Sequence, residues 1–142
     1  MPTGHNIPMG LRAAYLSMHR QSDACFVKHG VTANQFVLLA LLAEDDGITQ
    51  QQLTSRAFSD PNTIRAMLVL MEKQGLVIRE QHPEDGRARH ITITGTGRET
   101  FERLLEDSEP LRRRMLALFS GEELEMLADF LNRIITAMVE SQ

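Results

Sequence analysis

The sequence predicts a mainly α-helical fold with one small β-hairpin. Apolar residues recur at spacings of three and four along most of the chain, helix-capping pairs precede several of these stretches, and strand-like alternation is confined to about residues 76–94. The 142 residues, 42% apolar and 24% charged, have the length and composition of one ordinary domain with its own core.

The N-terminal half begins with two predicted helices. An apolar stripe places the first helix at about residues 9–28, and the cations and glycine of Lys28–Gly30 mark its end. Thr32 and Gln35 form a capping box that opens a second helix, residues 33–44. This second helix is apolar nearly all round, so we expect it to be buried.

Two shorter helices follow. Thr49 and Gln52 form another capping box, and Asp60 before Pro61 supplies an N-cap and a proline at the first helical position. The helix that begins at Pro61 is expected to end near residue 74. Its inward stripe is predicted to be Ile64, Met67, Leu68 and Met71, and its outward stripe Asn62, Arg65, Ala66 and Val69.

The C-terminal half is predicted to hold the hairpin and two long helices. Residues 76–81 and 89–94 are the two strand candidates, joined by a charged turn. The next helix starts near residue 95 and contains Pro110, which predicts a kink. Ser120 with Glu123 caps the last helix.

Two short helices joined by a tight turn and followed at once by a hairpin form the winged helix-turn-helix arrangement. We expect the second helix to enter a DNA major groove by its N-terminal end, with the hairpin tip over the neighbouring minor groove. Asn62 can pair with adenine and Arg65 with guanine, while Ser59 and the free N–H groups of the first turn can bind phosphate. The predicted DNA contacts are Ser59, Pro61, Asn62, Thr63, Arg65, Ala66, Arg87 and Arg89.

Each of these residues taken alone could be an ordinary first-turn or surface residue, so the prediction depends on their combination. The net charge of −4 does not suggest DNA binding by itself. Residues 50–100 nevertheless hold seven Lys/Arg and six Asp/Glu, while the rest of the chain holds eight and thirteen. The acidic excess therefore lies outside the segment that is predicted to read DNA.

Three sequence pieces in this segment resemble the MarR family of bacterial transcription regulators: Met71–Val77 (MEKQGLV), Pro83–Ala88 (PEDGRA) and Ile91–Thr94 (ITIT). The resemblance extends over nearly the whole chain. It implies that Asp85 braces the wing by pairing with an arginine and that Arg87 enters the minor groove. Many members carry basic residues where this chain has Ala66 and Gly86, so the operator sequence cannot be carried over.

The resemblance also implies that the protein is a homodimer. It further implies a ligand-responsive repressor that binds a pseudopalindromic operator. The chain is then one winged-helix domain over residues 1–142, with about 32–94 as the DNA-binding region and about 9–30 and 95–140 as dimerisation helices. Independently, the stripe within Leu124–Val139 would be exposed in a monomer, which favours pairing of two copies. The alternative is that these helices fold back on the same chain.

Members of the family are typically released from DNA by a small, often aromatic, effector bound between the dimer helices and the wing domain. The candidate lining residues are Tyr15, Met18, His19, Phe36 and Phe101. For Met18, Phe36 and Phe101 a place in the hydrophobic core is the stronger interpretation.

Other functional classes receive less support from the sequence. Cys25, the single cysteine, excludes an internal disulfide and favours the cytoplasm; we expect it to be buried rather than redox-active. No catalytic motif, metal site, cofactor site or membrane span is expected. The alternatives that remain are a winged-helix adaptor that binds protein and a redox-responsive regulator that acts through Cys25.

Overall fold

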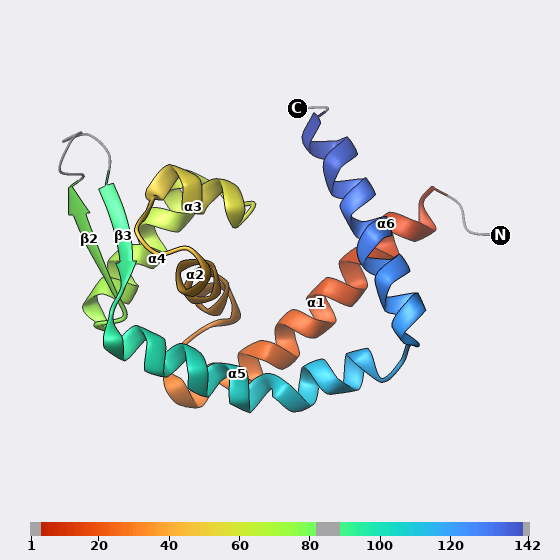
Figure 1. The fold of residues 1–142 in the computed structure, drawn as a ribbon, viewed down its shortest axis with the longest axis horizontal. Helices are drawn as coiled ribbons and strands as arrows, with labels where there is room; N and C mark the ends of the chain where they lie inside the picture. Colours follow the sequence, from red (N-terminus) through yellow and green to blue (C-terminus); the bar gives the residue numbers. More distant parts are fainter. Residues whose placement is uncertain (1–3, 82–88, 141–142) are drawn as a thin grey trace. The chain divides into compact units, whose positions relative to one another are not determined.

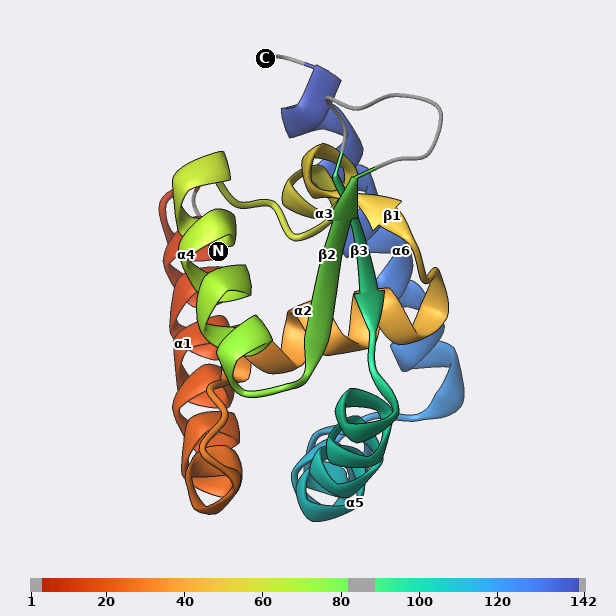
Figure 2. The same cartoon turned by 90° about the vertical axis from the view of Figure 1, so that its left-hand side faces the viewer.

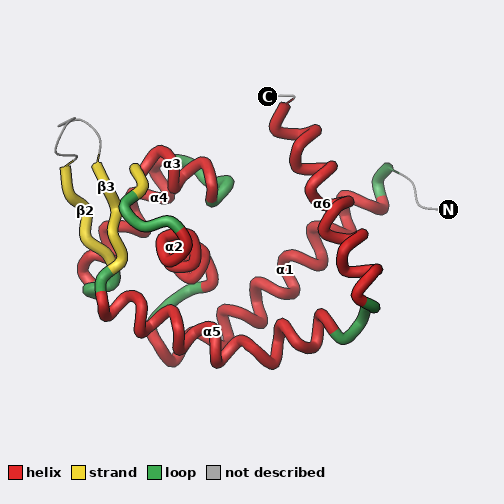
Figure 3. The backbone as a smooth tube through the Cα atoms, viewed as in Figure 1, coloured by secondary structure: helices red, strands yellow, loops and turns green. Residues whose placement is uncertain are grey.

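The computed structural model describes residues 4–81 and 89–140 and divides the chain into two compact units, Met1–Ser108 and Glu109–Gln142. Helices dominate both units, and the only strands among the described residues lie in the first (Figures 1 and 3). The prediction of a mainly α fold with a small β-hairpin is confirmed.

The first unit contains most of the secondary-structure elements. In chain order it holds α1 (Asn6–Phe26), a 3-10 turn (Val27–His29), α2 (Ala33–Glu44), β1 (Ile48–Thr49), α3 (Gln50–Arg56), α4 (Pro61–Lys73), β2 (Val77–Gln81), β3 (Arg89–Ile93) and the first part of α5 (Gly95–Leu116). α1 begins three residues earlier than the sequence predicted and ends earlier as well. The backbone N–H of Gly30, at a φ of 69°, donates to the carbonyl of Val27 and tightens the end into a 3-10 turn.

The capping boxes expected from the sequence are present. The Thr32 hydroxyl accepts from the backbone N–H of Gln35 and the Gln35 side chain accepts from that of Thr32, both at 3.1 Å. Thr49 and Gln52 make the same reciprocal pair at the start of α3. These side chains satisfy backbone donors that a helix leaves unpaired at its N-terminus.

The sheet has three antiparallel strands in the order β1-β3-β2, whereas the sequence predicted only the hairpin of β2 and β3 (Figure 2). β1 is two residues long, too short to show alternation, and it pairs Ile48 with Ile91. Asp46 holds this edge in place, because its carboxylate accepts from the backbone N–H of Ile93 at 2.9 Å and of Gly47 at 3.0 Å.

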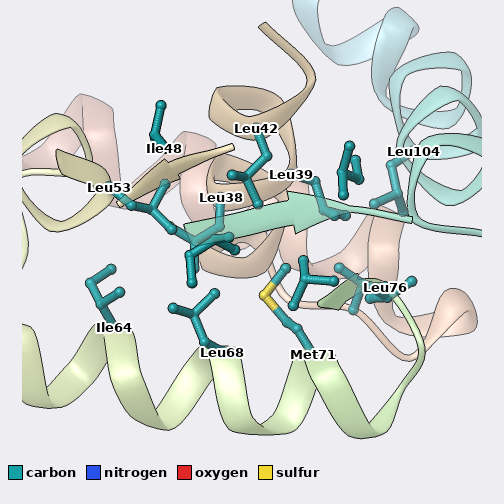
Figure 4. Close-up of a cluster of buried hydrophobic side chains, with 14 of the residues drawn as sticks. Leu38, Leu39, Leu42, Ile48, Leu53, Ile64, Leu68, Met71, Leu76 and Leu104 are labelled. Atoms are coloured by element: carbon teal, nitrogen blue, oxygen red, sulfur yellow. The ribbon is translucent and has the colours of Figure 1, made fainter. Parts of the chain in front are cut away.

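The core of the first unit lies between α2, α4 and the sheet (Figure 4). Ile64, Leu68 and Met71 point from α4 into it, and Met67 packs at its edge, so the predicted inward stripe is confirmed. α2 is less completely buried than expected, because Val37 is 42% exposed.

Thr94 and Gly97 fix the junction between the hairpin and α5. The Thr94 hydroxyl lies 2.6 Å from the carbonyl oxygen of Gly75 and accepts from the Gly97 N–H at 2.9 Å. Gly97 is buried, and a Cβ added there would lie 2.2 Å from the carbonyl oxygen of Leu76. Only glycine allows the helix to approach the strand this closely.

The second unit consists of the end of α5 and α6 (Gly121–Glu140). Ser120 and Glu123 form the predicted reciprocal cap. Pro110 lies inside α5 as expected, and the kink at this position stays a prediction. One face of α6 exposes large apolar side chains: Met126, Leu127, Phe130, Leu131, Ile134, Ile135, Met138 and Val139.

No single helix in the described parts of the chain is both long and apolar enough to cross a membrane. The helical segment Asn6–His29 and α2 pass that test only as a pair, by length and composition, and they are bent by 83° at the break between them.

Candidate nucleic-acid interface

The candidate interface begins at the turn between α3 and α4. Phe58 adopts a φ of 52° there and is the only residue other than glycine with a positive φ in the described ranges. The next residue, Ser59, is exposed, and its backbone N–H donates to the carbonyl of Thr54 at 3.2 Å. The chain thus leaves α3, turns sharply at Phe58 and enters α4.

Asp60 caps α4, as the sequence predicted. One carboxylate oxygen accepts from the backbone N–H of Thr63 at 2.9 Å, and the other accepts from the Thr63 hydroxyl at 2.6 Å. The hydrogen bond from the Thr63 hydroxyl, with that from its backbone N–H, holds the pKa of Asp60 below its usual value. The carboxylate is therefore ionised at neutral pH, beside the end of the helix that is expected to face DNA.

This cap changes the expectation that free N–H groups of the first turn bind phosphate. Pro61 has no N–H, and the Thr63 and Ile64 N–H groups already donate to Asp60. The Asn62 N–H also contributes to the lowered pKa of Asp60. At this end of α4, side-chain groups such as the Ser59 hydroxyl are better placed than backbone groups to meet phosphate.

The predicted reading residues of α4 share an exposed edge. Pro61, Asn62, Thr63, Arg65 and Ala66 are all exposed, while Ile64 between them is buried. Arg65 makes no ion pair with any described residue, so its guanidinium is available to a partner. The outward stripe is shorter than predicted, because Val69 is half-buried.

The structure describes little of the predicted wing contacts. Arg87 and Asp85 lie outside the described residues, as does Gly86. The backbone of Arg89 begins β3 opposite Gln81, and its side chain is likewise not described. The roles assigned to these residues from the sequence stay predictions.

Three basic residues of the central segment are held in ion pairs within the chain. The pairs are Arg56 with Asp45 at 2.8 Å, Arg79 with Glu72 at 3.0 Å, and Arg98 with Asp46 at 3.3 Å. The count of seven basic residues therefore overstates the charge that this segment can offer to a phosphate backbone.

The effector-pocket candidates separate into different environments. Phe36 and Phe101 are half-buried and stack with ring centroids 5.5 Å apart at the edge of the core, which agrees with the core interpretation. Met18 is 42% exposed, so the expectation that it is a core residue is wrong for the single chain. The Tyr15 hydroxyl lies 3.5 Å from Nδ1 of His19, and His19 also approaches Asp23 at 3.4 Å.

Of the five effector candidates, only Tyr15 lines a hollow of about 180 Å³ beside the helix-turn-helix. The other lining residues are Asn34, Val37, Leu38, Ala57, Phe58, Ser59, Thr63 and Met67. None of the lining residues that the structure describes is charged. This lining has no signature in the sequence, because its residues come from α1, α2, the turn and α4, and no spacing along the chain connects them.

Cys25 is half-buried and packs against the core, so it is less enclosed than the sequence predicted. His29, four residues later, contacts Asp107 of α5 at 2.5 Å, and Lys28 lies 3.4 Å from the same carboxylate. The hydrogen bond from His29 is the main cause that lowers the pKa of Asp107. This contact ties the 3-10 turn that follows α1 to α5 within the first unit.

A capped helix with an exposed polar edge, preceded by a short helix and followed by a hairpin, defines a winged helix-turn-helix protein. A sequence model of the MarR family matches residues 31–88. The transcriptional regulator HosA of Escherichia coli O111:H- is 30% identical over 107 residues, which cover 75% of this chain and 79% of HosA. The chain belongs to the MarR family of transcriptional regulators.

Two further comparisons extend this result. YdgJ, an uncharacterized HTH-type transcriptional regulator of Bacillus subtilis (strain 168), is 33% identical over 105 residues, which cover 74% of this chain but only 64% of YdgJ. The solved structure of the transcriptional repressor CouR bound to a 23-mer DNA duplex gives a TM-score of 0.81 at 25% identity and covers 89% of each chain. The backbone of this chain is thus similar to that of a protein solved on DNA.

Proposed function

We propose that this protein binds double-stranded DNA as a homodimer and represses transcription at a pseudopalindromic operator. The observation that carries the proposal is the exposed edge from Ser59 to Ala66, built on a capped helix and followed directly by the hairpin. The likeness to CouR, a repressor solved on DNA, supports it. We further propose that the protein acts in the cytoplasm and by binding, without catalysis of its own.

Sequence would be read by a small number of side chains. Asn62 suits adenine and Arg65 suits guanine in the major groove, and each good bidentate pair contributes about 1–3 kcal/mol of discrimination. Thr63 differs from these two, because its hydroxyl is engaged by Asp60. Arg87, which the sequence places between the two strands of the hairpin, is assigned to the minor groove, where it would strengthen binding to every sequence.

The proposal of a homodimer is supported by the exposed apolar face of α6. Eight large apolar side chains on one helix form a surface whose exposure to water is unfavourable, and a partner related by two-fold symmetry would cover it. A symmetric pair also places two recognition helices about 34 Å apart, one turn of DNA, which matches a pseudopalindrome.

The hollow beside the helix-turn-helix supports the proposal of a small effector. An apolar cavity of about 150 Å³ is known to hold benzene, so a hollow of about 180 Å³ has room for one aromatic ring with a small substituent. Within the described parts of the chain, its lining offers hydroxyl and amide groups but no charged side chain. A carboxylate would lose its hydration there without gaining a counter-charge, so we propose an uncharged aromatic effector.

A mobility-shift titration with DNA that flanks the protein's own gene tests DNA binding. We expect a shift that weakens as the salt concentration rises. Asn62→Ala should relax the preference at one base pair, and Arg87→Ala should weaken binding to all sequences. Asn132→Ala, a matched change on α6, should leave both unchanged. Absence of a shift at low salt, with the dimer confirmed by sedimentation, would contradict the proposal.

A further inference from the structure

Phe58 combines two properties that are unfavourable for a folded protein. Its φ of 52° lies in the left-handed region, where a Cβ is crowded and glycine is the favoured residue. The residue is also 72% exposed to water. A strained backbone and an exposed aromatic ring at one position are typical of a residue that is retained for function.

The surroundings of Phe58 indicate what that function is. The residue lines the hollow together with its neighbours Ala57 and Ser59, so the whole helix-turn-helix turn forms part of the wall. Thr63, in the first turn of α4, lines the same hollow. A molecule in the hollow would therefore touch the turn and the start of the recognition helix together.

We propose that Phe58 is a positioning residue that transmits the filling of the hollow to the DNA-reading edge of α4. An uncharged aromatic molecule packs against the Phe58 ring, and the left-handed turn then changes the direction in which the chain enters α4. The inference rests on the proposed function, because it assigns the regulation of the same interface.

The hydrogen bonds around the turn show how a local change would spread. Behind Phe58, the Ser59 N–H donates to the Thr54 carbonyl at 3.2 Å. Ahead of it, Asp60 is bonded to Thr63 by two contacts, and its carbonyl accepts from the Ile64 N–H at 3.1 Å. The first turn of α4 is thus a braced unit, so a rotation at Phe58 moves it as a whole rather than one side chain at a time.

A ligand can change DNA affinity only through a difference in its contacts with the two conformations. Phe58 is placed to provide such a difference, because it lines the hollow and is also the point where the backbone turns. By contrast, Val37 is a wall residue in the middle of α2, where the helix holds its backbone. We therefore assign the change in DNA binding that follows ligand binding to the turn at Phe58 rather than to Val37 of α2.

The ligand test uses benzamide and benzoate, which have nearly the same shape but differ in charge. Tyr15 is the only tyrosine in the chain, so fluorotyrosine labelling gives a single fluorine resonance beside the hollow. We expect benzamide to shift this resonance and to weaken DNA binding at least fivefold, the lower end of typical allosteric couplings, and benzoate to do neither. The absence of any effect of benzamide on both readouts would overturn the proposal.

Two variants separate the ring from the backbone strain. Phe58→Gly removes both, whereas Phe58→Ala removes the ring and keeps a Cβ at positive φ. We expect Phe58→Gly to raise the melting temperature and Phe58→Ala not to, while both still bind DNA but lose the benzamide response. A purely structural role would alter the melting temperature and leave that response intact, which would overturn the proposal.

The same experiment distinguishes failure of the inference from failure of the proposed function. Loss of DNA binding as such is visible in the mobility shift before any ligand is added. A normal shift that benzamide weakens equally in the wild type, Phe58→Gly and Phe58→Ala would refute the role of Phe58 alone and leave DNA binding intact.

Discussion

Replacement of Gly97 by alanine tests the packing that joins the wing to α5. The added methyl group would lie 2.2 Å from the carbonyl oxygen of Leu76 and 2.7 Å from Cγ1 of Ile93. The Ile93 side chain can turn away, but the Leu76 carbonyl belongs to the backbone and accepts from the Thr94 N–H at 3.0 Å. Relief of the clash therefore requires that the start of α5 move away from the hairpin.

The loss of stability depends on which atom the new methyl group meets. Overpacking costs about 1–3 kcal/mol in most cores, and we expect about 3 kcal/mol here because the closest atom cannot rotate away. For a chain of this size, each kcal/mol lowers the melting temperature by about 4 °C. Gly97→Ala should then melt roughly 12 °C below the wild type.

The measurement is thermal unfolding followed by circular dichroism, and Gly95 supplies the control. Gly95 begins the same helix, but a Cβ added there meets nothing within 4 Å. Gly95→Ala should be neutral or stabilise by about 0.4–1 kcal/mol, because alanine restricts the unfolded chain. Equal melting temperatures for the two variants would refute the reasoning about close approach.

Three further predictions concern reading, assembly and pH. Arg65→Gln should weaken binding to the best operator by about 1–3 kcal/mol and relax one base pair in a binding-site selection; an unchanged preference would contradict its role as a base reader. Phe130→Glu should convert the proposed dimer into monomers in sedimentation, because it places a charge in the apolar face of α6; a dimer of normal affinity would argue against that face as the interface. The hydrogen bond from His29 lowers the pKa of Asp107 in the folded chain, so this carboxyl contributes stability above its unfolded pKa, about 3.9, and the contribution is lost as the pH falls further. The urea concentration at the unfolding midpoint, measured between about pH 2 and pH 6, should therefore fall less steeply with decreasing pH in Asp107→Asn than in the wild type. An equally steep fall in both would contradict the assignment.

Local sequence signals predicted most of the helices well. Capping boxes such as Thr32 with Gln35 act over three residues, so they can be identified without knowledge of the fold. The same holds for the inward stripe of α4, because the period of one helix determines which side chains share a face. β1 was missed because Ile48 and Thr49 are a strand only through pairing with β3, and that partner lies about forty residues further along the chain.

The candidate site was only partly predictable, for a related reason. The exposed edge from Ser59 to Ala66 follows from one helix and its cap, so it is predictable from the sequence. The hollow depends on four segments that meet in space. Of its lining residues, the sequence therefore identified only Tyr15 as a candidate for the effector pocket. The position of Phe58 in the left-handed region leaves no signature either, since a sequence reader expects glycine or asparagine at such a turn.

The charges around α4 show why a residue count is a poor measure of DNA affinity. Arg56, Arg79 and Arg98 neutralise acidic partners within the chain, and Asp60 keeps a negative charge at the helix end that is proposed to approach the phosphates. Each such feature lowers the sequence-independent attraction that supplies most non-specific binding. A DNA-binding surface with these charges gains little binding free energy from the phosphate backbone. A larger share of its affinity for an operator therefore has to come from base contacts such as those proposed for Asn62 and Arg65. The ratio of specific to non-specific binding should therefore be high for a modest total affinity, and a small displacement of the first turn of α4 would be enough to release the protein.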